Sequence, residues 1–190
     1  MRNSLRFRSL APCILAIAFG WPSLQAASPS DVPGVANFHQ VNEHVYRGAQ
    51  PHGQGFAGLA QLGIKTVLDL RGERSERIAV ENAGMHYVRL PWSGYKAPSD
   101  SQIAAVLALL NDNSAWPVFV HCRRGADRTG TAIACYRIAH DHWTNARALD
   151  EARSLGMSSL ETAMRQYILH FAAPAVATPV TATILAPSLP

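Results

Sequence analysis

The sequence has few charged residues and few cysteines. Charged side chains make up 16% of the 190 residues and apolar ones 48%, so we expect a sizeable core and exclude wholesale disorder. Three cysteines and eight histidines are too few for a disulfide framework or a metal-rich protein. The length predicts one compact domain with little room for a second.

The excess of positive charge is small and comes mostly from the N-terminus. Seventeen Lys and Arg against 13 Asp and Glu give a net charge of +4, which alone would favour an acidic partner such as nucleic acid. Three of the seventeen, Arg2, Arg6 and Arg8, lie in the first eight residues. Without residues 1–27 the chain has 14 basic and 13 acidic residues, a net charge of +1. The sequence therefore predicts no general surface for nucleic acid.

The first 27 residues have the three parts of a secretory signal. A basic start precedes the apolar run Leu10–Phe19, and the small-residue stretch Gln25–Ser28 follows. The run is shorter than the roughly 20 residues of a membrane helix, and two prolines in this stretch disfavour an ordinary buried helix. We predict cleavage near Ala26 or Ala27 and an exported protein, periplasmic or secreted, without stable membrane insertion. An uncleaved anchor is the alternative.

Strand-like and helix-like segments alternate along the predicted domain, residues 28–171. Strand candidates are 44–47, 64–70, 85–90 and 117–121, and helix candidates are 56–62, 75–83, 99–110, 129–140, 144–155 and 158–171. Strands that alternate with helices, followed by helices alone, predict an α/β fold with a central, mainly parallel sheet of about four to five strands flanked by helices.

Three local features complete this outline. Residues 28–37 are rich in Pro, Ser, Gly and Asp and predict a loose leader. Ser158 and Glu161 have the spacing of a capping box at the start of the last helix. Residues 172–190 carry no charge and consist largely of Ala, Pro and Thr, which predicts a disordered tail.

The run 121–130, HCRRGADRTG, lies between a buried strand and a helix. Inward-pointing N–H groups of such a loop, together with the helix N-terminus, form a cradle for an anion. At its base a thiolate of Cys122 is favoured over the thiol. Arg128 offers two parallel donors to phosphate oxygens, and Thr129 places a hydroxyl near the sulfur. Gly125 supplies the backbone freedom that the loop needs.

These residues resemble the cysteine-dependent protein tyrosine phosphatase superfamily, whose signature His-Cys-x5-Arg-Ser/Thr-Gly is matched completely. The runs 45–51, VYRGAQP, and 63–71, GIKTVLDLR, are similar to the opening of compact atypical dual-specificity phosphatases, including exported bacterial members. The resemblance covers residues 40–170. It implies a phosphatase-like fold, attack of Cys122 on phosphorus, a cysteinyl-phosphate intermediate and its hydrolysis by water, with no metal and no cofactor.

The motif itself does not supply the general acid. Expulsion of the alcohol calls for a proton donor, yet residues 87–97, where many family members place it, contain no carboxylate. Some superfamily members carry an Asp at the position of Asp127, where it is proposed as the acid, so we expect Asp127 to serve. Asp100, which could merely cap a helix, is the alternative. Asp127 could instead only neutralise Arg123 or Arg124.

The expected substrate-binding residues are the loop positions Arg123, Arg124, Gly125, Ala126, Asp127 and Arg128. The basic rim favours substrates with several phosphates, such as inositol phosphates or phosphoinositides, although a solvated basic loop would look the same. Trp92 and Tyr95 are candidates for the pocket wall.

Four other side chains have a structural interpretation. We expect Cys135 to be a core residue and not the disulfide partner of Cys122. Asp69 and Arg71 end a strand and predict a structural ion pair, with a pocket-lining role as the alternative. His121 is expected to orient the loop through hydrogen bonds. His140 and His142 do not share a helix face, so we predict no metal site there.

The leading hypothesis is a phosphatase of phosphomonoesters of the protein phosphotyrosine or dual-specificity type. Its expected partner is a phosphorylated protein or a small phosphoester. The same loop is compatible with a phosphoinositide or inositol-phosphate phosphatase. Outside phosphatases, the alternatives are a rhodanese-type sulfurtransferase, disfavoured by the spacing from Cys122 to Arg128, and a catalytically inactive phosphate-binding module.

Overall fold

A five-stranded sheet forms the centre of the computed structural model, which describes residues 31–73 and 75–173. The strand order is β1-β2-β5-β3-β4. Four strands are parallel, and β1 pairs antiparallel with β2 at one edge. The strands are β1 (His39–Gln40), β2 (Val45–Ala49), β3 (Thr66–Asp69), β4 (His86–Arg89) and β5 (Val118–Cys122). The prediction of an α/β fold with a mainly parallel sheet is confirmed.

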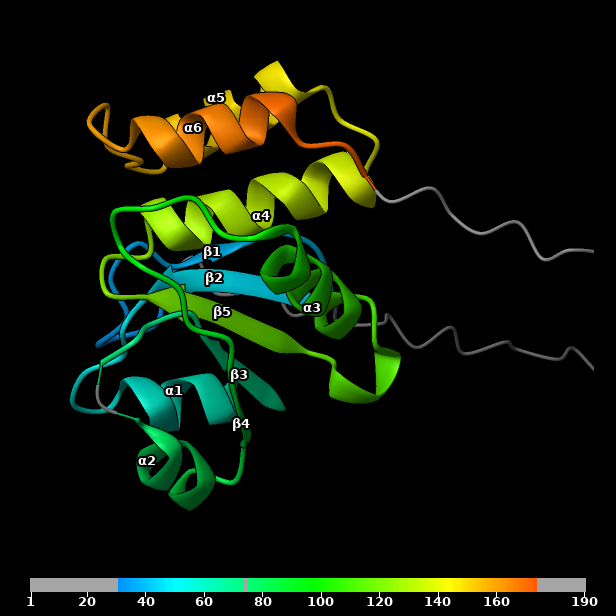
Figure 1. Cartoon of the computed structure of the whole chain (residues 1–190). Coiled ribbons are helices and arrows are strands. Elements are labelled where there is room, and N and C mark those ends of the chain that lie inside the picture. The colour runs from blue at the N-terminus through cyan, green and yellow to red at the C-terminus, as the bar shows by residue number, and fades with distance from the viewer. Residues whose placement is uncertain (1–30, 74, 174–190) are drawn as a thin grey trace, which may run out of the picture.

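Helices cover both faces of this sheet (Figure 1). On one face lie α1 (Gly55–Gln61) and α2 (Arg77–Asn82). On the other lie α3 (Asp100–Leu110) and α4 (Asp127–Ala139), and α5 (Asn145–Ser154) and α6 (Thr162–His170) pack outside α4. A short 3-10 helix, η1 (Asn113–Ala115), precedes β5. Both α4 and β5 are thus enclosed by other elements, as their almost continuous apolar sequences predict.

Strand β5 divides the core between the two faces. Val118 and Val120 pack into the cluster beneath α3 and α4, while Phe119 packs with the residues of α1 and α2 on the opposite face. This alternation follows from the two-residue period of a strand. All three side chains are fully buried, so β5, which carries Cys122 at its end, is anchored in the core on both faces of the sheet.

The leader prediction is wrong for the part of it that the structure describes. Val32 and Val35 are buried against Phe38, Tyr46 and Phe119. Isolated apolar residues between Pro and Gly fit no strand or helix period, so their burial was not visible as a pattern.

Two helix starts differ from the predicted ones. Helix α6 begins at Thr162 with Glu161 as its N-cap, without any side-chain cap bond, so the predicted capping box is wrong. Helix α4 begins at Asp127, two residues before the predicted start. The start of α3 is confirmed, because Ser99 and Gln102 form a reciprocal capping box.

The two cysteines of the described residues, Cys122 and Cys135, are both free. Cys135 is fully buried within the core cluster, as expected. The predicted signal, 1–27, lies outside the described residues, as does the tail apart from 172–173. In the part of the chain that the structure describes, no helix has the length and apolar character to cross a membrane.

Candidate active site

The predicted loop lies where strand β5 ends and helix α4 begins. β5 ends at Cys122, which is in register with Ala49 of the parallel neighbour β2, and α4 starts at Asp127. The four residues between them therefore lie at the carboxyl edge of the sheet and at the N-terminus of a 13-residue helix. The helix N-terminus supplies free backbone N–H groups and partial positive charge, so this place suits an anion.

The back of the loop is held at the carbonyl of Gly125. Its oxygen accepts hydrogen bonds from Nη2 of Arg47, at 2.7 Å, and from Nδ2 of Asn37, at 3.1 Å. Asn37 also donates to the carbonyl of Leu155. Gly125 itself has a φ of +68°, and a Cβ there would collide with the backbone of Gly48. Glycine is therefore required at this position both by conformation and by space.

Arg128 is buried, and backbone carbonyls hold its guanidinium. Nη1 donates to the carbonyls of Leu70, at 3.3 Å, and Trp92, at 3.5 Å. A carboxylate oxygen of the exposed Glu73 lies 3.8 Å away. Thr129 is fully buried, and its hydroxyl has no hydrogen-bond partner among residues 31–73 and 75–173. Its predicted role beside the sulfur of Cys122 stays a prediction.

A pocket of about 270 Å³ opens over this loop. Its lining is strongly polar: Glu73, Gly94, Tyr95, Cys122, Arg123, Arg124, Asp127, Arg128 and Glu161. Four of the six predicted substrate-binding residues line it, and Gly125 and Ala126 do not. Of the two aromatic candidates, Tyr95 lines the pocket, while Trp92 is buried beside it and contributes its carbonyl.

The structure brings one of the two predicted acids to the pocket. Asp127 accepts hydrogen bonds on both oxygens, from Nη2 of Arg124 at 2.6 Å and from the backbone N–H of Ser158 at 2.9 Å. Asp100 does not line this pocket. It accepts a hydrogen bond from the hydroxyl of Tyr167 and borders a separate, largely apolar cavity of about 440 Å³ between α3 and α6.

Glu73 and Glu161 are pocket residues that sequence reasoning missed. Glu73 lies three residues beyond the predicted strand 64–70, a distance at which a side chain can reach the same sheet edge. The sequence assigns Glu161 only to a predicted capping box, and no local pattern connects it with Cys122 across 39 positions of sequence. Arg47 and Asn37 were also missed as supports of the loop, because their contacts with Gly125 span 78 and 88 residues.

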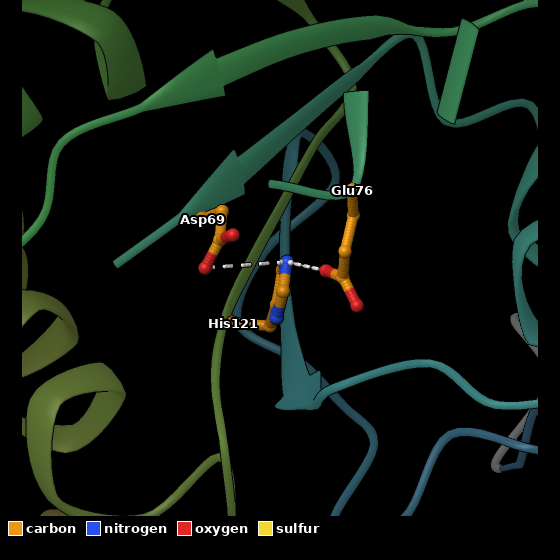
Figure 2. A group of neighbouring side chains, drawn as sticks. All are labelled: Asp69, Glu76 and His121. Carbon is orange, nitrogen blue, oxygen red and sulfur yellow. Dashed lines mark ion pairs between the residues drawn. The ribbon is translucent and has the colours of Figure 1, made fainter. Parts of the chain in front are cut away.

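Behind the loop lies a buried cluster of charged side chains (Figure 2). Arg71 pairs with Asp69 at 2.9 Å and with Glu76 at 2.8 Å. The hydroxyl group of Tyr87 donates a hydrogen bond to Asp69. The predicted ion pair of Asp69 and Arg71 is confirmed, and neither residue lines the pocket. Nε2 of His121 faces this cluster, 3.5 Å from Glu76 and 4.0 Å from Asp69.

Burial dominates the electrostatics of His121. The ring is fully buried, and burial lowers the pKa of His121 to about 4, so the ring is neutral at physiological pH. The backbone of Cys122, at the start of the loop, acts against burial and raises the pKa of His121, so the expected role of the ring in orienting the loop stays a prediction. His121 also stacks on Phe119, with ring centroids 5.7 Å apart.

Asp69, Glu76 and His121 are also close enough together to ligate a metal ion. The guanidinium of Arg71 already bonds to both carboxylates, and this cation occupies the place that a metal would need. We interpret the cluster as a structural ion-pair network. His140 and His142 belong to no metal-ligating group in the described part of the chain.

The parallel sheet, the Cys-x5-Arg loop and the helix behind it define a protein of the cysteine-dependent, protein tyrosine phosphatase-like class. A family model described as "DSP-PTPase phosphatase fused to NAD+ Kinase" matches residues 22–169. The chain belongs to this family. The predicted resemblance to dual-specificity phosphatases is thereby confirmed.

Individual relatives agree with this assignment. The chain is 32% identical over 133 residues to the dual specificity protein phosphatase TpbA of Pseudomonas aeruginosa, covering 70% of this chain and 58% of TpbA. It is 25% identical over 122 residues to inositol diphosphatase DSP5 of Arabidopsis thaliana, covering 60% of this chain and 59% of DSP5. The chain thus spans somewhat more than half the length of these curated relatives.

Solved structures show the same fold. The crystal structure of TpbA matches with a TM-score of 0.62 and 28% identity, covering 70% of this chain and 83% of that one. The catalytic core of the PP-IP phosphatase Siw14 from Saccharomyces cerevisiae matches with a TM-score of 0.65 and 27% identity, covering 75% and 89%. A further TpbA structure is a complex with phosphotyrosine.

Proposed function

We propose that this protein hydrolyses phosphomonoesters through a cysteinyl-phosphate intermediate on Cys122. The observation that carries the proposal is the pocket in which Cys122 and Arg128 face a common space of about 270 Å³ at the N-terminus of α4. A phosphate group fits such a space. The guanidinium of Arg128, which two backbone carbonyls hold in place, can donate hydrogen bonds to two of the phosphate oxygens.

The reaction has two halves. In the first, the thiolate sulfur of Cys122 attacks phosphorus, the P–O bond of the ester breaks, and the leaving oxygen takes a proton. In the second, a water oxygen attacks phosphorus, the P–S bond breaks, and the thiolate returns with release of inorganic phosphate. Arg128 and the loop N–H groups stabilise the charge on the phosphoryl oxygens throughout.

Asp127 is proposed as the proton donor of the first half. Its support is position, since it lines the pocket and Asp100 does not. Both of its carboxylate oxygens already accept hydrogen bonds from protein donors, so the Asp127→Asn variant is an informative test. Its activity is expected to fall about 10²-fold on an alkyl phosphate and far less on p-nitrophenyl phosphate, whose leaving group needs no proton. Full activity of Asp127→Asn on alkyl phosphates would exclude Asp127.

Proteins with phosphotyrosine, or both phosphotyrosine and phosphoserine, are the proposed substrates. Support comes from TpbA, named a dual specificity protein phosphatase and solved with phosphotyrosine. A second candidate is an inositol phosphate with several phosphates. The exposed Arg124 and the neighbouring Arg123 on the pocket rim favour it, as do the names of Siw14 and DSP5.

We also propose that the protein is exported, on the sequence pattern of residues 1–27 alone. Export would place the substrate outside the cytoplasm, in the periplasm or beyond. Mass spectrometry of the protein recovered from culture fractions would show a new N-terminus near Ala26 or Ala27. An intact Met1 in the cytoplasmic fraction would contradict export.

The decisive experiment measures phosphate release from p-nitrophenyl phosphate by the full chain. Cys122→Ser is expected to abolish it, whereas Cys135→Ala, which removes the buried core thiol, retains it. Thiosulfate-dependent sulfur transfer in place of phosphate release would establish the rhodanese alternative, and phosphate binding without turnover would indicate an inactive module. A panel of phosphotyrosyl and phosphoseryl peptides, inositol phosphates and phosphoinositides then separates the substrate classes by kcat/KM.

A further inference from the structure

The turn between α5 and α6, residues 155–161, is fixed against the active-site loop. The backbone N–H of Ser158 donates to Asp127 at 2.9 Å. The methyl carbon of Met157 lies so close to Gly130 of α4 that a Cβ there would be only 3.2 Å away. This turn therefore has a defined position relative to the pocket, and its last residue, Glu161, reaches the pocket wall.

The backbone of Glu161 takes part in the hydrogen bonds at the start of α6, whereas its side chain does not. The carbonyl accepts the N–H of Arg165 at 3.0 Å, and the N–H donates to the carbonyl of Ser158 at 3.3 Å. The carboxylate caps no N–H group of α6. No hydrogen bond or ion pair engages it among residues 31–73 and 75–173 of the structure.

This freedom distinguishes Glu161 from the two other carboxylates of the pocket. Both oxygens of Asp127 accept hydrogen bonds from protein donors. Glu73 lies 3.8 Å from the guanidinium of Arg128. Glu161 is therefore the pocket carboxylate with the most free acceptor positions for a hydrogen bond from a bound water molecule.

We propose that Glu161 is a further catalytic residue, the base of the second half of the reaction. This inference rests on the proposed phosphatase function. As the water oxygen bonds to phosphorus and the P–S bond to Cys122 breaks, one water proton passes to the carboxylate of Glu161. Solvent in the open pocket then takes this proton, which restores the carboxylate for the next turnover.

A residue that acts only in the second half of the reaction can be distinguished by its kinetics from one that acts in the first half. In a reaction with a covalent intermediate, kcat/KM reports the steps up to formation of that intermediate, and slower hydrolysis lowers kcat and KM together. Loss of the base is therefore expected to leave kcat/KM unchanged. Loss of an acid for the first half would instead lower kcat/KM on poor leaving groups.

The test is Glu161→Gln in the full chain with p-nitrophenyl phosphate. We expect kcat and KM each to fall about 10²-fold, with a burst of about one nitrophenolate per enzyme before the slow steady state. Mass spectrometry after acid quench is expected to find the phosphoryl group on Cys122. The midpoint of thermal unfolding is expected to be unchanged, because the carboxylate has no partner among the residues that the structure describes.

Glu43→Gln is the matched control. Glu43 is exposed and precedes β2 at the end of the sheet opposite Cys122, so the variant removes the same charge away from the pocket and is expected to keep wild-type kinetics. If Glu161→Gln keeps its kcat, or loses kcat/KM without a burst, the assignment is wrong. Failure of the phosphatase function itself looks different, because the wild-type chain would then release no more phosphate than Cys122→Ser.

Discussion

Nη2 of Arg47 donates to the carbonyl oxygen of Gly125 at 2.7 Å, joining strand β2 to the active-site loop. The guanidinium is almost completely buried, and its Nε and Nη1 atoms have no hydrogen-bond partner in the described part of the chain. Burial lowers the pKa of Arg47 to about 10. Keeping a charge in such surroundings opposes folding, so we interpret Arg47 as a residue that positions the loop.

Arg47→Met tests this interpretation by separating activity from stability. The substitution keeps an unbranched side chain and removes the charge, and the Gly125 carbonyl retains the amide of Asn37. We expect the free energy of unfolding in urea to change by less than about 2 kcal/mol. The value of kcat/KM is expected to fall roughly 10²-fold, since small displacements of catalytic groups have large effects. Unchanged kinetics would contradict a positioning role.

Gly125→Ala and Gly84→Ala form a matched pair for the loop backbone. Both glycines have a positive φ, +68° and +81°. A Cβ at Gly125 would collide with the backbone of Gly48, whereas a Cβ at Gly84 would meet no described atom within 4 Å. We expect a loss of about 1 kcal/mol for Gly84→Ala and at least about 3 kcal/mol for Gly125→Ala, measured by urea denaturation. Equal losses would show that conformation alone, and not space, requires Gly125.

The sequence was informative wherever neighbouring residues determine the structure. The strand candidates 64–70 and 85–90 contain β3 and β4, and 117–121 covers β5 except for its last residue, because period and composition are local properties. The loop 121–130 could be placed between strand and helix for the same reason. Cys122, Arg128 and Asp127 then meet in one pocket because they lie within seven positions of each other.

The residues that hold the active-site loop, and the pocket residue contributed by the turn before α6, could not be predicted from the sequence. Asn37 lies in a stretch without any period, and its amide bonds reach residues 88 and 118 positions away. Glu161 reaches the pocket only because the turn before α6 packs on the start of α4. Asp100 shows the converse, because its modest separation from Cys122 in sequence does not bring it to the pocket. Tertiary packing determines these placements, and the local patterns of a single sequence do not predict it.

Asp69→Asn and Glu81→Gln compare a buried ion pair with an exposed one. Asp69 is fully buried and bonds to Arg71, while Glu81 pairs with Arg77 on the surface of α2. We expect Asp69→Asn to lower the free energy of unfolding by about 3 kcal/mol, because the buried guanidinium loses its charged partner. Glu81→Gln is expected to lower it by no more than about 0.5 kcal/mol. A loss below about 1 kcal/mol for Asp69→Asn would show that Glu76 alone satisfies Arg71.

Because His121 is buried, we expect the free energy of unfolding to depend on pH in the acid range. Its pKa is about 4 in the folded chain because of burial and about 6.5 when unfolded. Between these values the unfolded chain binds more protons, so the contribution of His121 is fully present above pH 6.5 and is lost as the pH falls toward 4. A shift of this size corresponds to roughly 3 kcal/mol.

Urea denaturation of the wild type and of His121→Gln between pH 4 and pH 7 measures this contribution. Other titrating groups, such as Glu76, whose pKa burial raises, act in both proteins and largely cancel in the comparison. We expect the difference in unfolding free energy between the two proteins to shrink by roughly 3 kcal/mol as the pH falls from 7 to 4. A constant difference would mean that His121 is already protonated in the folded chain, in contact with Asp69 and Glu76. The neutral ring inferred from its burial would then be wrong.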